Sequence, residues 1–211
     1  MDFLGGLDSL IAEKIKMLPM ILPGIIIAIT LHELAHGYVA YALGDTTAKN
    51  KGRLSFNPLV HIDIAGFLFL IIAGFGWAKP VPINPMNFKN RKLGTILVSI
   101  AGPVTNFLIA IITILILAIV PINNSLILNI VISIAIYNII LGIFNLLPFP
   151  PLDGSKIVAS LLPTKYEILF YKYQKYLYGI LLILILTNGI DRVLGPVLDF
   201  SYNIIVRAIF F

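Results

Sequence analysis

The chain holds 60 consecutive residues, from Leu93 to Leu152, without one Asp, Glu, Lys or Arg. A soluble domain rarely leaves such a stretch uncharged, because about a quarter of its residues are normally charged. A helix needs roughly 20 apolar residues to cross the ~30 Å hydrocarbon core of a bilayer. The run is long enough for two crossings, and the polar turn at 121–125 divides it into expected transmembrane helices over 93–120 and 126–147.

The composition of the whole chain agrees with a membrane protein. Of its 211 residues, 59% are apolar and 12% are charged, and the mean hydropathy is +0.98. These values exclude a disordered chain and an ordinary soluble enzyme. The chain has no cysteine, which excludes disulfides and thiolate metal sites. Its net charge of +5 is better explained by membrane orientation, so we expect no nucleic-acid partner.

Apolar segments of different lengths lie outside the central run. Residues 17–44 form a 28-residue apolar stretch with one formal charge, which suits a further membrane helix. Residues 62–77 are too short to span, so we expect a re-entrant segment or short β-like strands there. The other expected segments are an amphipathic start at 1–16 and C-terminal helices at 166–190 and 193–211. Together they predict one transmembrane domain over 1–211, an all-α polytopic fold with about four to six transmembrane or re-entrant helices.

The distribution of positive charge predicts the orientation of these helices. The connectors at 45–61 and 77–92 contain seven Lys and Arg residues, whereas the turn at 121–125 contains none. By the positive-inside rule, both connectors face the cytoplasm. We therefore expect a multi-pass protein of the cell membrane, surrounded by the lipid bilayer.

A polar cluster interrupts the apolar 17–44 segment. It reads His32-Glu33-Leu34-Ala35-His36, the H-E-x-x-H pattern. At 3.6 residues per turn, both histidines lie on one helix face and can reach one metal ion. Glu33 projects about 100° around the helix from His32, so it can contact a water on the metal without being a ligand. Zinc peptidases need this arrangement, so we predict one zinc ion per chain with Glu33 as the catalytic base.

Chance and simple packing are weaker explanations of the pattern. With three His and three Glu in the chain, a shuffled sequence would contain it about six times in ten thousand. The alternative is a polar cluster that only hydrogen-bonds a neighbouring helix. A charged residue at membrane depth costs at least ~2.5 kcal/mol, so three polar groups within five residues favour a metal site.

The third protein ligand has two candidates. Asp153 ends the uncharged run in a proline-rich segment, 148–155, and irregular backbone at membrane depth is tolerated only against protein or a water-filled cavity. The simpler interpretation of Asp153 is a cap for the helix that follows. His61 is the rival, because it is the remaining histidine and zinc favours imidazole. The residues alone leave both open.

Two segments resemble the signatures of the site-2 protease family, the intramembrane zinc metalloproteases of peptidase family M50. The first is the pattern at 32–36, and the second is Asn145 to Gly154, with its spaced prolines and Leu-Asp-Gly. Residues 102–106, Gly-Pro-Val-Thr-Asn, are similar to a further element of that family. The chain is similar to the short form of the family, without a PDZ or CBS domain.

The resemblance implies the roles of four residues. His32, His36 and Asp153 would bind zinc, and Glu33 would be the base, in an active site toward the cytoplasmic side. The role of His61 stays open between a ligand and a structural residue.

The implied function is intramembrane proteolysis. We expect a zinc metalloendopeptidase that hydrolyses peptide bonds in or near transmembrane segments of other membrane proteins, as in regulated intramembrane proteolysis. The segment around Pro148 and Pro150 is expected to be extended and to hold an unwound substrate by edge pairing. Asn106 and Asn145 are candidates for donating to the substrate or to the oxyanion, with interhelical hydrogen bonding as the alternative for both.

A metal or ion transporter is the alternative function. It would use the same polar cluster as a transit site. Such transporters usually need polar sites across the whole bilayer and often an inverted repeat. Here the polar residues gather at one depth and no repeat is visible, which favours the protease.

Overall fold

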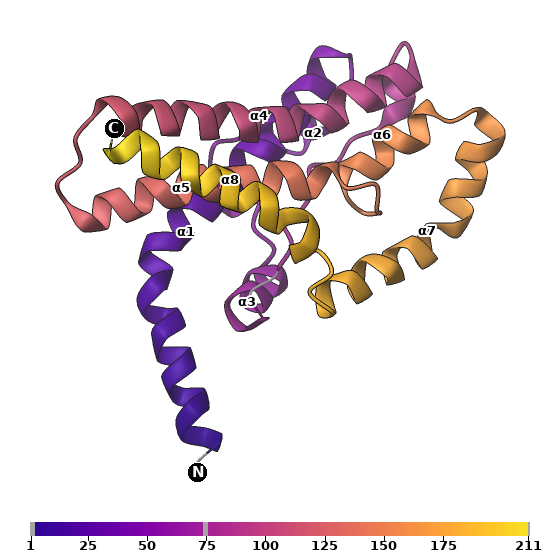
Figure 1. Ribbon diagram of the computed structural model, residues 1–211. Helices are drawn as coiled ribbons and strands as arrows, with labels where there is room; N and C mark the ends of the chain where they lie inside the picture. Colours follow the sequence, from indigo (N-terminus) through magenta and orange to yellow (C-terminus); the bar gives the residue numbers. More distant parts are fainter. Residues whose placement is uncertain (1–2, 74–75, 211) are drawn as a thin grey trace.

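The computed structural model describes residues 3–73 and 76–210, except that the side chains of residues 3–15, 71–73, 191, 193 and 210 lie outside the description. Figure 1 shows a chain of helices joined by short connections. In chain order the elements are α1 (Phe3–Ala42), α2 (Thr47–Asn50), the 3-10 turn η1 (Pro58–Val60), α3 (Ile64–Ala73), the 3-10 turn η2 (Pro85–Asn87), α4 (Arg91–Ile119), α5 (Ser125–Leu146), α6 (Asp153–Leu161), α7 (Thr164–Leu186) and α8 (Asp191–Phe210).

The expected all-α polytopic fold is confirmed. Four helical segments are long and apolar enough to cross a membrane: Lys16–Ala42 within α1, and the helices α4, α5 and α7. Within the described residues the backbone forms no β-strand, and an isolated antiparallel bridge joins Ile62 to Ala78. The segment expected as re-entrant or as short strands contains the ten-residue helix α3.

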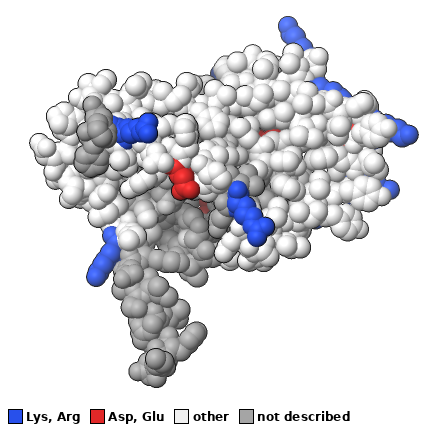
Figure 2. Space-filling view, in the orientation of Figure 1, with Lys and Arg blue, Asp and Glu red and all other residues white. Residues whose placement is uncertain are grey.

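The surface of the helices suits lipid. Figure 2 shows a face on which most side chains are neither acidic nor basic. On α4, the side chains of Leu108, Ile111, Ile112 and Leu115 are all more than half exposed. A ridge of this kind is favourable against acyl chains and costly in water. The chain is therefore a multi-pass membrane protein.

Helix α1 is continuous from Phe3 to Ala42, so its backbone has no break at residues 16–17, where the sequence divides the expected amphipathic start from the zinc helix. The side chains of residues 3–15 lie outside the description, and the amphipathic character of this part stays a prediction. The other end of α1 is set by Gly44, whose φ of 102° favours glycine. There the Asp45 N–H donates to the Ala40 carbonyl at 2.9 Å, which closes the last turn.

Helices α1, α4 and α5 pack against one another and form the centre of the molecule. Figure 1 shows α4 and α5 as an antiparallel pair with α8 alongside. The uncharged turn between them ends at Asn124, whose side chain accepts from the N–H groups of Leu126 and Ile127 and so begins α5. Helix α1 crosses α5 closely at Gly24, where an added Cβ would lie 2.7 Å from the Ser133 backbone. A small residue permits this approach of two membrane helices.

The C-terminal helices α7 and α8 occupy the regions expected at 166–190 and 193–211. Helix α7 is held at its beginning by the buried carboxylate of Glu167, which accepts from both terminal nitrogens of Arg91 at 2.6 and 2.9 Å. Lys92 lies 3.4 Å from the same carboxylate. Beyond this ion-pair cluster, α7 diverges from the other long helices (Figure 1).

Candidate metal centre

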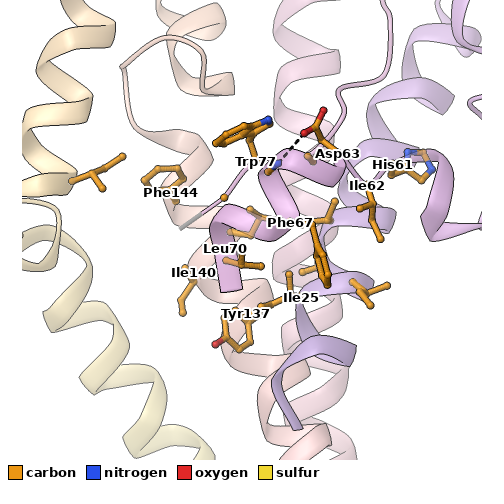
Figure 3. Close-up of a pocket in the computed structure, with 18 of the residues that line it drawn as sticks. Ile25, His61, Ile62, Asp63, Phe67, Leu70, Trp77, Tyr137, Ile140 and Phe144 are labelled. Carbon is orange, nitrogen blue, oxygen red and sulfur yellow. Dashed lines mark hydrogen bonds between the residues drawn. The ribbon is translucent and has the colours of Figure 1, made fainter. Parts of the chain in front are cut away.

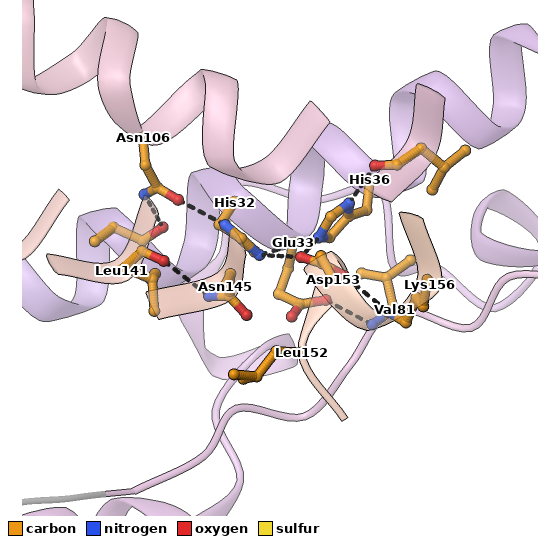
Figure 4. Close-up of polar contacts among 12 residues, drawn as sticks. His32, Glu33, His36, Val81, Asn106, Leu141, Asn145, Leu152, Asp153 and Lys156 are labelled. Atoms are coloured by element: carbon orange, nitrogen blue, oxygen red, sulfur yellow. Dashed lines mark hydrogen bonds and ion pairs between the residues drawn. The ribbon is translucent and has the colours of Figure 1, made fainter. Parts of the chain in front are cut away.

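The two histidines of the motif converge on one point. His32 and His36 lie one turn apart on α1, and their Nε2 atoms are 3.0 Å apart. The Oδ2 atom of Asp153, at the first residue of α6, lies 3.1 Å from the His32 Nε2 and 2.9 Å from the His36 Nε2 (Figure 4). All three side chains are buried. Residues 121 positions apart in sequence therefore form a triangle with edges of about 3 Å.

The connection between α5 and α6 brings Asp153 to this point. Helix α5 ends at Leu146, and α6 begins at Asp153, after a connection of six residues. Gly154 permits the return of the chain, because an added Cβ there would lie 2.2 Å from the Leu146 carbonyl oxygen. The two backbones therefore approach each other closely at Gly154.

The proline-rich connection is compact rather than extended. The Leu152 N–H donates to the Phe149 carbonyl at 2.9 Å, and residues 147–152 form bends and turns. The expectation of an extended segment around Pro148 and Pro150 is therefore wrong, because its backbone hydrogen bonds close a turn. No strand forms among the described residues around these prolines, so the structure offers no strand edge there with which a substrate could pair.

The hydrogen bonds of the other ring nitrogens assign the tautomers. The Nδ1 atom of His36 lies 2.7 Å from the Val98 carbonyl oxygen. A carbonyl has no proton to give, so Nδ1 must carry the hydrogen and donate it. The Nδ1 atom of His32 lies 2.6 Å from the Asn106 Oδ1 and donates in the same way. In the neutral imidazoles both Nε2 atoms therefore direct lone pairs at each other and at the Asp153 carboxylate.

Three lone pairs that face one another within about 3 Å, with no hydrogen between them, form a favourable site for a cation. Tetrahedral zinc with ligand bonds of ~2.0–2.1 Å would separate its ligand atoms by about 3.3 Å, close to the edges of this triangle. Two imidazoles and one carboxylate form a donor set that zinc favours, with a fourth position left over. The residues therefore fit the metal. Among the described residues, no other group of His, Cys, Asp or Glu side chains meets the same geometric test.

Glu33 lies next to the triangle without belonging to it. Its half-buried carboxylate accepts from the Val81 N–H through Oε2 at 2.7 Å, and Figure 4 shows it beside the two histidines. The backbone of residues 78–84 therefore passes the motif and fixes one oxygen of this carboxylate. The other oxygen is Oε1.

Lys156 neutralises the far side of Asp153. Its Nζ donates to the Asp153 Oδ1 at 2.8 Å, while Oδ2 faces the histidines. Burial raises the pKa of the Asp153 carboxyl, but the adjacent His32 and His36 side chains and the charge of Lys156 outweigh burial and hold this pKa well below its usual range. Asp153 is thus an anion that presents one oxygen to the metal position.

The two candidate asparagines have different partners. Both amide hydrogens of Asn106 are engaged, one by the Ala28 carbonyl and one by the Asn138 Oδ1. Asn106 therefore has no hydrogen left for a substrate, which favours interhelical hydrogen bonding, the alternative expected for it. Asn145 donates to the Leu141 carbonyl at 3.0 Å, which engages one of its two amide hydrogens. Asn145 keeps a hydrogen that a substrate could accept.

His61 lies outside the triangle. Its Nε2 donates to the Ser55 carbonyl at 2.8 Å, and its own carbonyl accepts from the Lys79 N–H. It lines a mainly apolar cavity of about 340 Å³ between α1, α3 and α5 (Figure 3). The geometry thus favours Asp153 over His61 as the third ligand and gives His61 a structural position between two connectors.

A second cavity, of about 200 Å³, reaches the triangle itself. His36, Asp153 and Lys156 line it together with Val81 and Val98. Space for a small reactant therefore exists beside two of the three converging residues.

Gly102 allows α4 to approach both histidines. An added Cβ at Gly102 would lie 2.5 Å from the His32 Cε1 and 2.6 Å from the His36 Nε2. We expect Gly102→Ala to weaken zinc binding at least about 10-fold, because one or both imidazoles must move. Zinc affinity by chelator competition checks this. Gly179→Ala is the matched control, because an added Cβ there meets nothing within 4 Å; equal affinity of the two variants would contradict the close packing at Gly102.

Asp45 links the end of α1 to the loop that carries the partner of Glu33. Its buried carboxylate accepts from the Thr47 N–H and hydroxyl, from the Asn84 N–H at 2.7 Å and from the Asn87 side chain at 2.7 Å. Burial raises the pKa of Asp45, but these donors outweigh burial and lower it below 3.8. The loop at 84–87 is thereby fixed to α1.

The lowered pKa of Asp45 predicts a pH dependence of stability. The folded state binds the proton more weakly than the unfolded state, so the contribution is complete above the unfolded pKa of 3.8 and is lost as pH falls below it. We expect Asp45→Asn to lower the free energy of unfolding by about 1–3 kcal/mol at neutral pH, because one oxygen becomes a donor facing donors. Denaturant unfolding in micelles at pH 3 and pH 6 checks this. A difference between the variant and the wild type that is the same at both pH values would contradict it.

Sequence reasoning missed several residues of the site. Val81 and Val98 contribute backbone groups, which carry no side-chain signal. Lys156 follows the second signature, and Asn138 lies on α5. Both are polar, but their hydrogen-bond partners are known only from the folded chain.

Comparison with known proteins agrees with the geometry. The family profile Peptidase family M50 matches residues 121–187. The chain is 38% identical over 209 residues to the Bacillus subtilis protein named "Putative zinc metalloprotease YwhC", covering 95% of each chain. It is 25% identical over 203 residues to "Putative zinc metalloprotease Rip2" of Mycolicibacterium smegmatis, covering 89% of this chain and 77% of that one.

A third relative is longer than this chain. "Zinc metalloprotease MJ0392" of Methanocaldococcus jannaschii is 30% identical over 141 residues, which are 66% of this chain and 33% of that protein. No solved structure matches the chain significantly. The family profile and the nearly complete match to the Bacillus subtilis protein confirm the resemblance of the two signatures. The chain belongs to peptidase family M50, the site-2 protease family, and is a metalloprotease.

Proposed function

We propose that the chain is an intramembrane zinc metalloendopeptidase that cleaves membrane-protein substrates in or near their transmembrane segments. The observation that carries the proposal is the buried triangle of the His32 Nε2, the His36 Nε2 and the Asp153 Oδ2, with Glu33 beside it. Two of its members lie on a helix long and apolar enough to span a bilayer. The relatives named zinc metalloproteases support zinc as the metal.

His32, His36 and Asp153 would hold the zinc, and Glu33 would be the base. When bound, zinc would polarise the scissile carbonyl and lower the pKa of a water. The Oε1 of Glu33 would accept a proton from the attacking water and pass it to the leaving amine, while the Val81 N–H holds Oε2. The remaining amide hydrogen of Asn145 would donate to the substrate carbonyl.

The position of the site supports a transmembrane substrate. The reacting groups are buried within apolar helices, and a helical substrate must unwind before its peptide bonds, which are hydrogen-bonded along the helix, become accessible. Lys156 is half-exposed beside Asp153, and the loops on this side of the site carry Lys49, Lys51, Arg53 and Lys79. By the positive-inside rule, the site lies toward the cytoplasm.

A transporter is less well supported. The metal-binding candidates are at one depth, and membership in a peptidase family favours hydrolysis.

Metal removal tests the proposal. The purified protein is treated with a chelator and incubated with a panel of single-span membrane proteins, then reloaded with zinc. We expect cleavage to stop on removal and to return with one zinc per chain, because water activation depends on the metal. Cleavage that continues without metal would overturn the proposal.

A further inference from the structure

Two buried asparagines form a chain of hydrogen bonds that ends at His32. Asn106 on α4 and Asn138 on α5 are both fully buried, and the Asn106 Nδ2 donates to the Asn138 Oδ1 at 2.8 Å. Asn138 does not contact His32, His36 or Asp153 through any hydrogen bond. It is linked to His32 by two successive hydrogen bonds, through Asn106.

The direction of both amides is determined by backbone carbonyls. The nitrogen and oxygen of an amide side chain are distinguished by their partners, because only the nitrogen donates. The Asn138 Nδ2 donates to the Ile134 carbonyl at 2.8 Å, which leaves its Oδ1 for Asn106. The Asn106 Nδ2 also donates to the Ala28 carbonyl at 3.1 Å. A reversed Asn106 would place its oxygen against two acceptors.

This direction decides which nitrogen of His32 carries the hydrogen. With its Nδ2 engaged, Asn106 presents Oδ1 to the His32 Nδ1 at 2.6 Å, and that oxygen can only accept (Figure 4). The hydrogen of His32 is therefore on Nδ1, and the lone pair is on Nε2, facing His36 and Asp153. Outer hydrogen bonds of this kind fix the tautomer and ring orientation of metal-binding histidines.

We propose that Asn138 is a positioning residue for the metal centre, which acts through Asn106 to hold the His32 lone pair on the metal position. The inference rests on the proposed zinc function, and it gives the pair of asparagines a task beyond joining helices. The relay connects three helices, since Ala28 lies on α1, Asn106 on α4 and Asn138 on α5. Without Asn138 the amide of Asn106 loses one of the two acceptors that orient it.

Zinc affinity of the purified full chain tests the proposal, measured by competition between the protein and a chelator with Zn²⁺ alone as the probe. Asn138→Ala is expected to weaken zinc binding about 10-fold, at the lower end of outer-shell effects. Ser133→Ala is the matched control, because this buried α5 hydroxyl donates to the Ile130 carbonyl and does not reach the site. The control is expected to bind zinc within about twofold of the wild type.

A double variant separates positioning from packing. Asn106→Ala removes the only hydrogen-bonded link between His32 and Asn138 that the described residues show. We expect Asn106→Ala to weaken zinc binding about 10–100-fold. Adding Asn138→Ala to that variant should change the zinc affinity by less than about twofold, because the link through which Asn138 acts is already gone. If Asn138 only supports packing, its substitution weakens zinc binding equally in both backgrounds.

The outcomes distinguish this proposal from the zinc function. A wild type that binds no zinc overturns the metalloprotease mechanism itself. A wild type that binds zinc, with an Asn138→Ala variant of equal affinity, overturns only the positioning role. A further 10-fold loss on adding Asn138→Ala to Asn106→Ala also overturns it.

Discussion

Replacing Glu33 with Gln is expected to lower the rate of substrate cleavage by about 10²–10⁴-fold, the range attributed to a positioned general base. The amide is nearly the same size and can still meet the Val81 N–H with its oxygen, but it cannot take a proton at neutral pH. Because Glu33 is not a member of the metal triangle, zinc occupancy should stay at the wild-type level. Cleavage of a single-span substrate and bound zinc are measured on the same preparation.

The exposed carboxylate of Asp199 on α8 provides the control for this experiment. Asp199→Asn makes the same chemical change away from the site and should cleave at the wild-type rate. If Glu33→Gln cleaves as fast as the wild type, Glu33 is not the base. If it loses zinc along with activity, its role is structural.

Asp153→Ala is expected to produce the second large effect, a loss of zinc affinity of at least about 100-fold. The removal of an outer-shell partner alone costs ~10–100-fold, and Asp153 supplies one of the three ligand atoms. The change also leaves the Lys156 ammonium beside the metal position without its carboxylate, which adds repulsion to the lost bond. Zinc per chain after dialysis against a chelator is the measurement.

The effect of the unpaired Lys156 charge must be separated from the loss of the Asp153 ligand atom in that experiment. The double variant with Lys156→Met removes the unpaired charge and should recover only part of the affinity, because the ligand atom is still missing. Zinc retained at full occupancy in Asp153→Ala would show that another residue is the third ligand. His61, buried and hydrogen-bonded to Ser55 in the present structure, would then have to be reconsidered.

The parts of the site that follow from sequence are those set by local geometry. His32 and His36 share a helix face because of their spacing, and no tertiary information is needed to place them together. Asp153 could be predicted as a candidate ligand from the sequence because it ends the uncharged run and follows three prolines. The residues alone left His61 open as well; the family resemblance favoured Asp153, and the turn at 147–152 brings Asp153 to the histidines.

Other parts depend on contacts that residue patterns do not contain. Val98 accepts from His36 through its backbone carbonyl, and Val81 donates to Glu33 through its backbone N–H. Residue type does not determine such contacts, except that proline at position 81 would lack the N–H. Asn106 is polar at membrane depth, which suits a substrate contact and an interhelical hydrogen bond equally. The structure engages both its hydrogens inside the bundle, and only the neighbouring helices reveal that.

The long helices were predictable because a bilayer imposes length and apolarity on every span. The expected ranges 93–120 and 126–147 correspond to α4 and α5 within a few residues. The continuity of α1 through residue 17 was not predictable, since its charged first third ends the hydropathy signal without breaking the backbone. Helix α3 could not be predicted either, because a ten-residue apolar stretch is compatible with a strand or a helix.

The coordination of zinc in the purified protein tests the central claim most directly. X-ray absorption at the zinc edge, on protein loaded with one zinc per chain, is expected to show four nitrogen and oxygen ligands at ~2.0–2.2 Å with an imidazole contribution from two histidines. The imidazole contribution should fall to one histidine in His36→Ala. A six-coordinate oxygen shell, or a spectrum that His36→Ala leaves unchanged, would contradict a zinc centre built from His32, His36 and Asp153.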